Sequence, residues 1–125
     1  MPVKLVLGLQ HGDEGKGRVV DDLCQTWADV IVRFQGGGNA GHTVYSESGK
    51  KFVTHILPVG VLNKDKISII SKGCVVNIVD LYEEIKSLDV SSKSIYVSSL
   101  CPIIEPVHIL IDRSKYQGKI GTTAK

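Results

Sequence analysis

The chain has 125 residues, of which 42% are hydrophobic and 22% charged, and it carries a formal net charge of +2. This composition predicts one packed domain and excludes a disordered segment. The small net charge, with Lys and Arg spread along the chain, argues against nucleic-acid and membrane partners. We also find no apolar run of the roughly 18 residues that a membrane span needs.

The three cysteines give a first indication of the compartment. Cys24, Cys74 and Cys101 are odd in number and have no CxxC spacing, which argues against a disulfide framework and against a thiolate zinc site. We therefore predict three buried structural thiols and a cytoplasmic location.

The first predicted elements form a βαβ unit. Val3–Gly8 is short, apolar and followed by a glycine-rich loop, which predicts a buried strand. The apolar residues of Lys16–Trp27 recur at helical spacing, and Val30–Phe34 is again apolar enough for a buried strand. The order of strand, loop, helix and strand predicts a parallel sheet with a right-handed crossover.

Beyond Phe34, a hairpin is predicted over Thr43–Tyr45 and Lys51–His55, with Gly49 taking a positive φ in its turn. The elements that follow are a strand over Ile67–Ser71, a helix over Ile78–Leu88 capped by Asn77, a strand over Ser94–Ser98 and a helix over Val107–Tyr116.

The first glycine-rich loop, Gly12–Arg18, partly resembles a phosphate-binding P-loop. The Walker pattern fails, because Gln10 stands where a glycine is needed and Gly17 stands where Ser or Thr is needed. The glycines can still form a nest of N–H groups at a helix N-terminus, with Lys16 as a point charge for the same phosphate. The alternative is an ordinary strand-to-helix turn with a surface lysine.

Both loops also carry groups suited to proton transfer. Asp13 and Glu14 are adjacent, and neighbouring side chains are expected to point in different directions on most backbones, so that one can act on a ligand while the other braces the loop. His42 follows small residues in the second loop, Gln35–Thr43, where its ring is open to a ligand. The alternatives are solvated surface charges and a histidine satisfied within a turn. The remaining histidines have no metal-ligand spacing and are expected to be structural or surface residues: His11, His55 and His108.

Four segments resemble motifs of the adenylosuccinate synthetase family. Gln10–Arg18 matches Q-x-G-D-E-G-K-G-[KR], and Gln35–Thr43 matches Q-G-G-x-N-A-G-H-T. Ile120–Lys125 matches the beginning of a third motif, I-G-T-T-x-[KR], and Leu57–Gly60 resembles L-P-S-G with Val in place of Ser. The resemblance covers essentially the whole chain. It implies an α/β fold with a mainly parallel β-sheet flanked by helices, P-loop-NTPase-like, and a small β-hairpin.

The resemblance implies a ligase of purine biosynthesis that joins IMP and L-aspartate to form adenylosuccinate. GTP would be hydrolysed to GDP and phosphate through 6-phosphoryl-IMP, with one Mg²⁺ ion in each active site. Asp13 would take the N1 proton of IMP, His42 would act as the acid at O6, and Lys16 would offset charge that grows during phosphoryl transfer. Asp13 and the carbonyl of Gly41 would ligate the Mg²⁺. Related viral enzymes that aminate a guanine nucleotide replace the aspartate, so an intact Asp13 favours IMP.

The same resemblance implies two overlapping sets of binding residues. The GTP-binding set is Gly12, Asp13, Glu14, Gly15, Lys16, Gly17, Arg18, Gly41, His42 and Thr43. The IMP-binding set is Asp13, Glu14, Gly15, Lys16, Asn39, Ala40, Gly41, His42 and Thr123.

Members of this family are several times longer than 125 residues. We therefore expect residues 1–125 to be the N-terminal part of a single GTP/IMP-binding domain, with a homodimer as the full-length form and little or no activity in this chain alone. Two other classes of function stay open. One is a purine-nucleotide-binding module or inactive fragment, in which Asp13 and His42 do no chemistry, and the other is a phosphotransferase of unknown acceptor.

Overall fold

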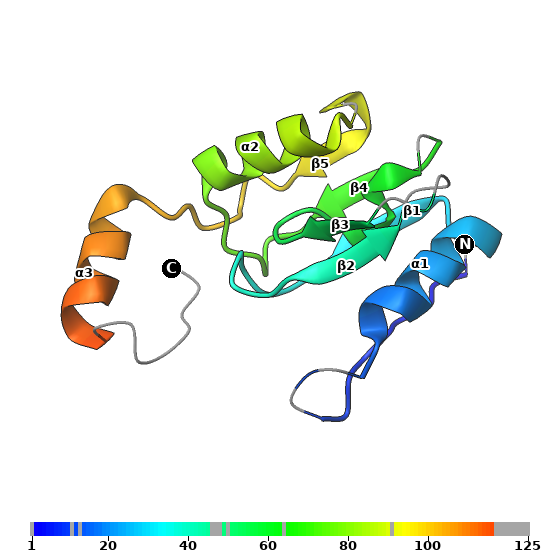
Figure 1. Ribbon diagram of the computed structural model, residues 1–125, viewed down its shortest axis with the longest axis horizontal. Helices are drawn as coiled ribbons and strands as arrows, with labels where there is room; N and C mark the ends of the chain where they lie inside the picture. The colour runs from blue at the N-terminus through cyan, green and yellow to red at the C-terminus, as the bar shows by residue number, and fades with distance from the viewer. Residues whose placement is uncertain are drawn as a thin grey trace.

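The computed structural model describes residues 2–10, 12, 14–45, 49, 51–63, 65–90 and 92–116. Its elements are, in chain order, α1 (Lys16–Thr26), β1 (Val30–Arg33), β2 (His42–Tyr45), β3 (Lys51–Thr54), η1 (Val59–Leu62), β4 (Ile67–Ile70), α2 (Ile78–Leu88), η2 (Ser92–Ser94), β5 (Ile95–Val97) and α3 (Pro106–Tyr116) (Figure 1).

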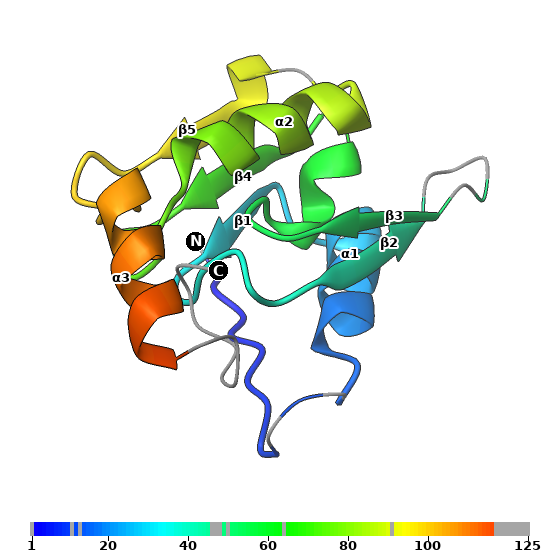
Figure 2. The same ribbon diagram turned by 60° about the vertical axis from the view of Figure 1, so that its left-hand side comes forward.

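Three of the described strands form a parallel sheet of order β1-β4-β5. Val30 of β1 pairs with Ile67 of β4, and Ile70 at the other end of β4 pairs with Val97 of β5. The chain runs from β4 to β5 through α2, which lies along these two strands in both views (Figures 1 and 2). The predicted α/β architecture, a parallel sheet flanked by helices, is confirmed.

The predicted hairpin is also confirmed. β2 and β3 pair antiparallel as a separate two-stranded sheet, in which His42 stands opposite Thr54. Gly49 adopts the predicted positive φ, 78°, while Ser46–Ser48 and Lys50 lie outside the described residues. The hairpin packs against α1 and η1, which places His42 beside the N-terminal turn of α1.

The prediction of a buried strand over Val3–Gly8 is wrong. The segment has no strand pairing among the described residues, and its side chains are largely exposed, with Leu5 at 64% and Leu7 at 58%. Val6 and Leu7 face β1 across a cavity instead of forming hydrogen bonds with it. An apolar run shows that burial is favourable, but a strand also needs a neighbouring edge within hydrogen-bonding distance.

The core lies between the sheet and α2. Leu57, Ile70, Val76 and Leu88 are buried there, and Leu81 and Ile85 of α2 pack against them. The three cysteines are buried and free, as predicted. No helix in the described ranges is both long enough and apolar enough to cross a membrane.

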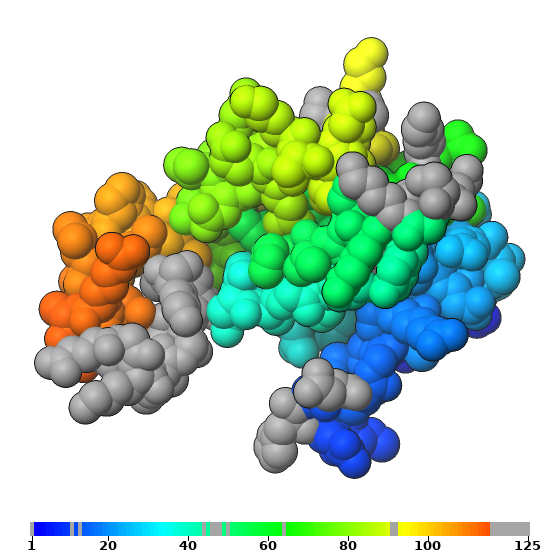
Figure 3. Space-filling view, in the orientation of Figure 1, coloured from blue at the N-terminus to red at the C-terminus, as the bar shows by residue number. Residues whose placement is uncertain are grey.

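Local capping explains where the second and third helices begin. Asn77 precedes α2, and its side chain accepts hydrogen bonds from the amides of Val79 (3.0 Å) and Asp80 (3.4 Å), as predicted. Before α3, the amide of Glu105 donates to Nδ1 of His108 (2.9 Å), which gives this histidine the structural role expected of it. Figure 3 shows α3 at one end of the molecule, beside the body formed by the sheet and α2.

Candidate functional site

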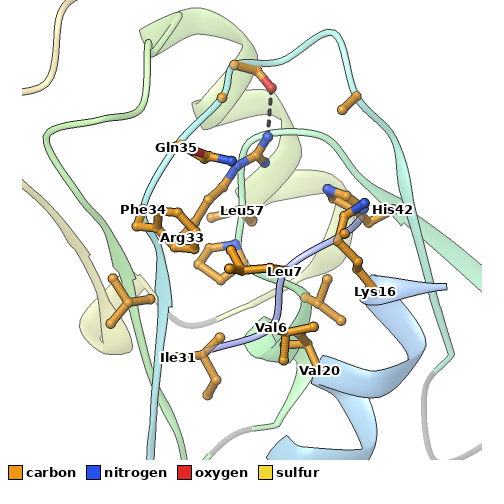
Figure 4. A pocket seen from close by; sticks show the side chains of 18 of the residues that line it. Val6, Leu7, Lys16, Val20, Ile31, Arg33, Phe34, Gln35, His42 and Leu57 are labelled. Atoms are coloured by element: carbon orange, nitrogen blue, oxygen red, sulfur yellow. Dashed lines mark hydrogen bonds between the residues drawn. The ribbon is translucent and has the colours of Figure 1, made fainter. Parts of the chain in front are cut away.

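A cavity of about 430 Å³ lies where the two glycine-rich loops meet (Figure 4). It is bounded by the N-terminal segment, the start of α1, strand β1 with the loop that follows it, and the segment after β3. Its lining residues are Val6, Leu7, Gly8, Gln10, Lys16, Gly17, Val20, Ile31, Val32, Arg33, Phe34, Gln35, Gly36, Gly37, Asn39, Ala40, His42, Leu57, Pro58 and Val59. The cavity therefore sits at the carboxyl end of a parallel strand, where α/β proteins commonly bind ligands.

The first loop leads into an open helix N-terminus. Gly12 has a φ of 126° and Gly15 has a φ of 78°, a left-handed conformation that glycine adopts without steric cost. Gly15 is the N-cap of α1 and has no side chain that could accept a hydrogen bond from the first turn. The N–H groups at the start of α1 are therefore suited to an anionic ligand, as the glycine spacing predicts.

Glu14 braces this loop. Its carboxylate accepts a hydrogen bond from the amide of Gln10 (2.9 Å) and forms an ion pair with the ammonium of Lys16. The bond from Lys16 is the main reason why the pKa of Glu14 falls to about 2. A side chain at Gly8 would stand 2.6 Å from both partners of this ion pair, so a glycine there leaves room for it. Of the two adjacent acids, Glu14 thus takes the bracing role.

His42 begins β2 and lies against the first turn of α1. A Cβ built at Gly17 would stand 3.8 Å from Nδ1 of His42, an ordinary contact distance, so the imidazole packs directly beside the first turn of this helix. Burial lowers the pKa of His42, and the positive charges of Arg33 and Lys16 lower it further. The folded chain therefore favours the neutral form of this imidazole. Figure 4 shows it on the same side of the cavity as Lys16.

The second loop is fixed by its backbone. The carbonyl of Gly36 accepts a hydrogen bond from the amide of Val75 (2.9 Å), and the carbonyl of Gly37 accepts one from Nη2 of Arg33 (2.7 Å). In Figure 4 a dashed line from the Arg33 guanidinium marks the second bond. These contacts hold Asn39 and Ala40 at the cavity wall.

The structure brings together only part of the predicted site. Residues from both loops line the cavity: Lys16, Gly17, Asn39, Ala40 and His42. Other predicted residues are described but lie outside the lining: Gly12, Glu14, Gly15, Arg18, Gly41 and Thr43. Asp13 and Thr123 lie outside the described residues.

Two charged residues in this region were not predicted. Arg33 stands in an otherwise apolar strand, and Glu84 stands on the apolar face of α2, where it is buried with only 8% of its surface exposed. A charge inside an apolar pattern is the sequence signal that could have identified both. Their hydrogen-bond partners are backbone groups, however, and backbone groups leave no signature in the sequence.

The predicted metal ligands are one carboxylate, Asp13, and one carbonyl, that of Gly41. Gly41 is exposed, and its backbone approaches Val53 and His55 closely, because a Cβ there would stand 3.2 Å and 3.3 Å from their side chains. Within the described ranges, no three His, Cys, Asp or Glu side chains gather in a metal-ligand cluster. Carboxylate and carbonyl oxygens are hard donors of the kind that Mg²⁺ takes, together with water and phosphate oxygens.

Comparison with known proteins identifies the family. The family model described as adenylosuccinate synthetase matches residues 5–125. The adenylosuccinate synthetase of Halothermothrix orenii is 46% identical over 98% of this chain and 30% of its own length, and the chloroplastic one of Chlamydomonas reinhardtii is 43% identical over 90% and 24%.

Solved structures give the same result. A fully ligated adenylosuccinate synthetase from Plasmodium falciparum superposes with a TM-score of 0.79 and 40% identity, over 90% of this chain and 26% of that one. The succinoaminodeoxyadenylate synthetase of cyanophage S-2L, bound to dGMP and dATP, superposes with a TM-score of 0.67 and 25% identity, over 85% of this chain and 30% of that one. The chain thus spans about 30% of the length of the curated relatives it matches. Since the family model matches nearly all of its residues, the chain belongs to the adenylosuccinate synthetase family.

Proposed function

We propose that this chain supplies the phosphate-binding and proton-transfer residues of a GTP-dependent ligase that joins IMP and L-aspartate to form adenylosuccinate. The observation that carries the proposal is that Lys16 and His42, which come from two separate family motifs, line one cavity of about 430 Å³. In this proposal residues 1–125 are the N-terminal part of a single GTP/IMP-binding domain. The complete protein is a cytoplasmic homodimer.

Phosphate binding follows from the first loop. The open N-terminus of α1 and the glycines before it offer N–H groups to the GTP phosphates. Lys16 lies at the same end of the helix, and its ammonium offsets the negative charge that grows on the γ-phosphate as it is transferred. Glu14 holds Lys16 before the nucleotide binds, so we expect the ammonium to move from this carboxylate to the phosphate.

Proton transfer follows from Asp13 and His42. Asp13 removes the N1 proton of IMP, which builds negative charge on O6 and makes this oxygen the nucleophile toward the γ-phosphate of GTP. The neutral imidazole of His42 donates a hydrogen bond to O6 while the bond from O6 to the γ-phosphorus forms and GDP leaves. When the aspartate amine attacks C6, the C6–O6 bond breaks and phosphate leaves with O6, and His42 passes to it the proton that the amine loses.

Mg²⁺ fits this site by the chemistry of its donors. The carboxylate of Asp13 and the carbonyl of Gly41 would hold the ion, together with phosphate oxygens and water. When bound, it would neutralise the charge that develops on the transferred phosphoryl group.

The test is a chimaera in which residues 1–125 replace the matching segment of the Halothermothrix orenii relative. We expect the chimaera to form adenylosuccinate, followed by absorbance, from IMP, GTP, Mg²⁺ and L-aspartate. Asp13→Asn removes the base, so turnover should fall by a factor of about 100 or more while GTP and IMP still bind. Glu83→Gln makes the same change of charge on an exposed residue of α2 and should leave turnover unchanged. A folded chimaera that binds both nucleotides without turnover would instead support a nucleotide-binding module.

A further inference from the structure

Glu84 is a buried carboxylate that the proposed mechanism does not use. It lies on α2 between Leu81, which packs against the core, and Leu88, which is part of it. Only 8% of the surface of Glu84 is exposed. A carboxylate without partners would be very costly at such a position. The groups that satisfy it therefore indicate what it does.

These groups are three consecutive backbone amides. Oε1 of Glu84 accepts hydrogen bonds from the amides of His55 (2.9 Å) and Leu57 (3.2 Å), and Oε2 accepts one from the amide of Ile56 (2.9 Å). The three amides follow the end of β3, where the strand ladder no longer provides acceptors. An ionised carboxylate suits them because its two oxygens accept several hydrogen bonds and donate none.

Arg33 holds the same segment from another side. Its Nη1 donates to the carbonyl of His55, and its Nη2 donates to the carbonyl of Gly37 (2.7 Å). The guanidinium thus joins the segment after β3 to the second glycine-rich loop. Residues 55–57 are fixed by an anion at their amides and by a cation at a carbonyl.

This segment leads directly to the candidate site. Thr54 precedes it, is fully buried, pairs with His42 in the hairpin, and donates from Oγ1 to the carbonyl of His42 (3.5 Å). Leu57, at the other end, continues into Pro58 and Val59 of the cavity wall. A displacement of residues 55–57 would therefore move both the backbone of His42 and one wall of the cavity.

We propose that Glu84 is a positioning residue for the reaction: through the amides of His55–Leu57 it holds His42 and the wall over Leu57–Val59 in the geometry that phosphoryl transfer needs. Arg33 completes the same arrangement from the opposite side. This inference rests on the proposed function, but the hydrogen bonds that it invokes can be tested separately from turnover.

The test substitutes Glu84→Gln in the full-length chimaera, with Glu83→Gln as the matched control on the same helix. The carboxamide that replaces the carboxylate would put a donor against a backbone donor, so at least one of the three hydrogen bonds is lost. We expect hydrogen–deuterium exchange at residues 55–57 to rise about tenfold or more, as for a lost hydrogen bond to a charged group. We expect kcat per folded molecule to fall by about 10–100-fold, as for a displaced catalytic group, with the KM for GTP changed by much less. The control should leave all three quantities at the wild-type value.

A second variant covers the case in which Glu84→Gln does not fold. Arg33→Lys keeps the positive charge but cannot donate to both carbonyls in the planar arrangement of a guanidinium, so exchange and kcat should change in the same directions. If hydrogen–deuterium exchange at residues 55–57 rises while kcat stays unchanged, the role of Glu84 is structural and the positioning role is overturned. If exchange at these residues is unchanged in a folded variant, the hydrogen bonds of Glu84 and Arg33 to this segment are overturned. If the wild-type chimaera makes no adenylosuccinate, the proposed function fails by itself. In that case, raised exchange in Glu84→Gln that extends from residues 55–57 to the amide of His42 would still support positioning of the hairpin, and raised exchange confined to residues 55–57 would overturn it.

Discussion

Gly60 marks the point where η1, α1 and β1 meet, and one added methyl group there tests the packing behind the cavity wall. A Cβ at this position would stand 2.6 Å from Sγ of Cys24 on α1 and 2.8 Å from Cγ1 of Ile31 on β1. Both residues are buried, so neither side chain can turn away into solvent. Gly60→Ala should therefore force α1 or η1 to shift.

Two opposing contributions set the size of the effect. Overpacking of a well-packed core costs about 1–3 kcal/mol. Replacing glycine by alanine returns about 0.4–1 kcal/mol, because the unfolded chain loses freedom. We therefore expect the free energy of unfolding to fall by about 1–2 kcal/mol.

The assay is urea unfolding of the chain, followed by the fluorescence of its single tryptophan, Trp27, which caps the end of α1. Gly38→Ala is the control: its Cβ would meet Cγ1 of Ile56 at 3.5 Å, an ordinary contact, so only the unfolded-chain contribution remains, and the free energy of unfolding should rise by about 0.4–1 kcal/mol. Cys24→Ala removes one of the clashing atoms, so the double variant should be more stable than the sum of the single effects by at least about 0.5 kcal/mol. A Gly60→Ala chain as stable as the wild type, or strict additivity with Cys24→Ala, would refute this account of the packing.

Three further predictions concern capping, titration and thiol reactivity. Asn77→Ala removes the acceptor for two amides at the start of α2 and should lower the free energy of unfolding by about 1 kcal/mol in the same urea assay, whereas Asn77→Asp should retain most of it. The folded state lowers the pKa of His42 below its unfolded value, so this residue favours the folded state above about pH 6.5 and its contribution is lost as the pH falls through the folded pKa. In the His42→Gln variant, the free energy of unfolding should therefore fall less than in the wild type as the pH drops below neutrality. An equal fall in both proteins would contradict a lowered pKa of His42. Burial raises the pKa of Cys24 to about 11, so this thiol should resist a thiol reagent at pH 8 in the native chain and react once urea unfolds it, as mass spectrometry of the modified peptide can show.

Local sequence signals were sufficient for most of the fold. The apolar periodicity over Ile78–Leu88 with Asn77 before it gave α2 and its cap, because a helix and its N-cap are determined by neighbouring residues. The glycine at position 49 likewise indicated the hairpin turn, because glycine adopts a positive φ readily, and the structure has it there. The segment Val3–Gly8 was mistaken for a strand because pairing depends on a distant edge, about which its own residues carry no information.

In the candidate site, too, the residues recognisable by their type could be predicted, and the contacts that depend on distant parts of the chain could not. Lys16 and His42 could be found from the sequence, because glycine-rich loops and titratable side chains are recognisable by residue type. The contacts of Glu84 could not be found in this way, since a carboxylate bonded to backbone amides can serve any three residues that the fold brings to it. The sequence showed only that Glu84 stands on the apolar face of α2, where a buried charge needs hydrogen-bond partners.

In the proposed reaction, GTP is used to activate O6 of IMP at the site formed by the two glycine-rich loops. This step is tested most directly by supplying the chimaera with IMP labelled with ¹⁸O at C6, together with GTP, Mg²⁺ and L-aspartate, and following the phosphate by ³¹P NMR. We expect the label to appear in inorganic phosphate in proportion to the adenylosuccinate formed, and Asp13→Asn to abolish this transfer. Inorganic phosphate released without the label would show that water, and not O6, attacks GTP, and the proposed reaction would be wrong.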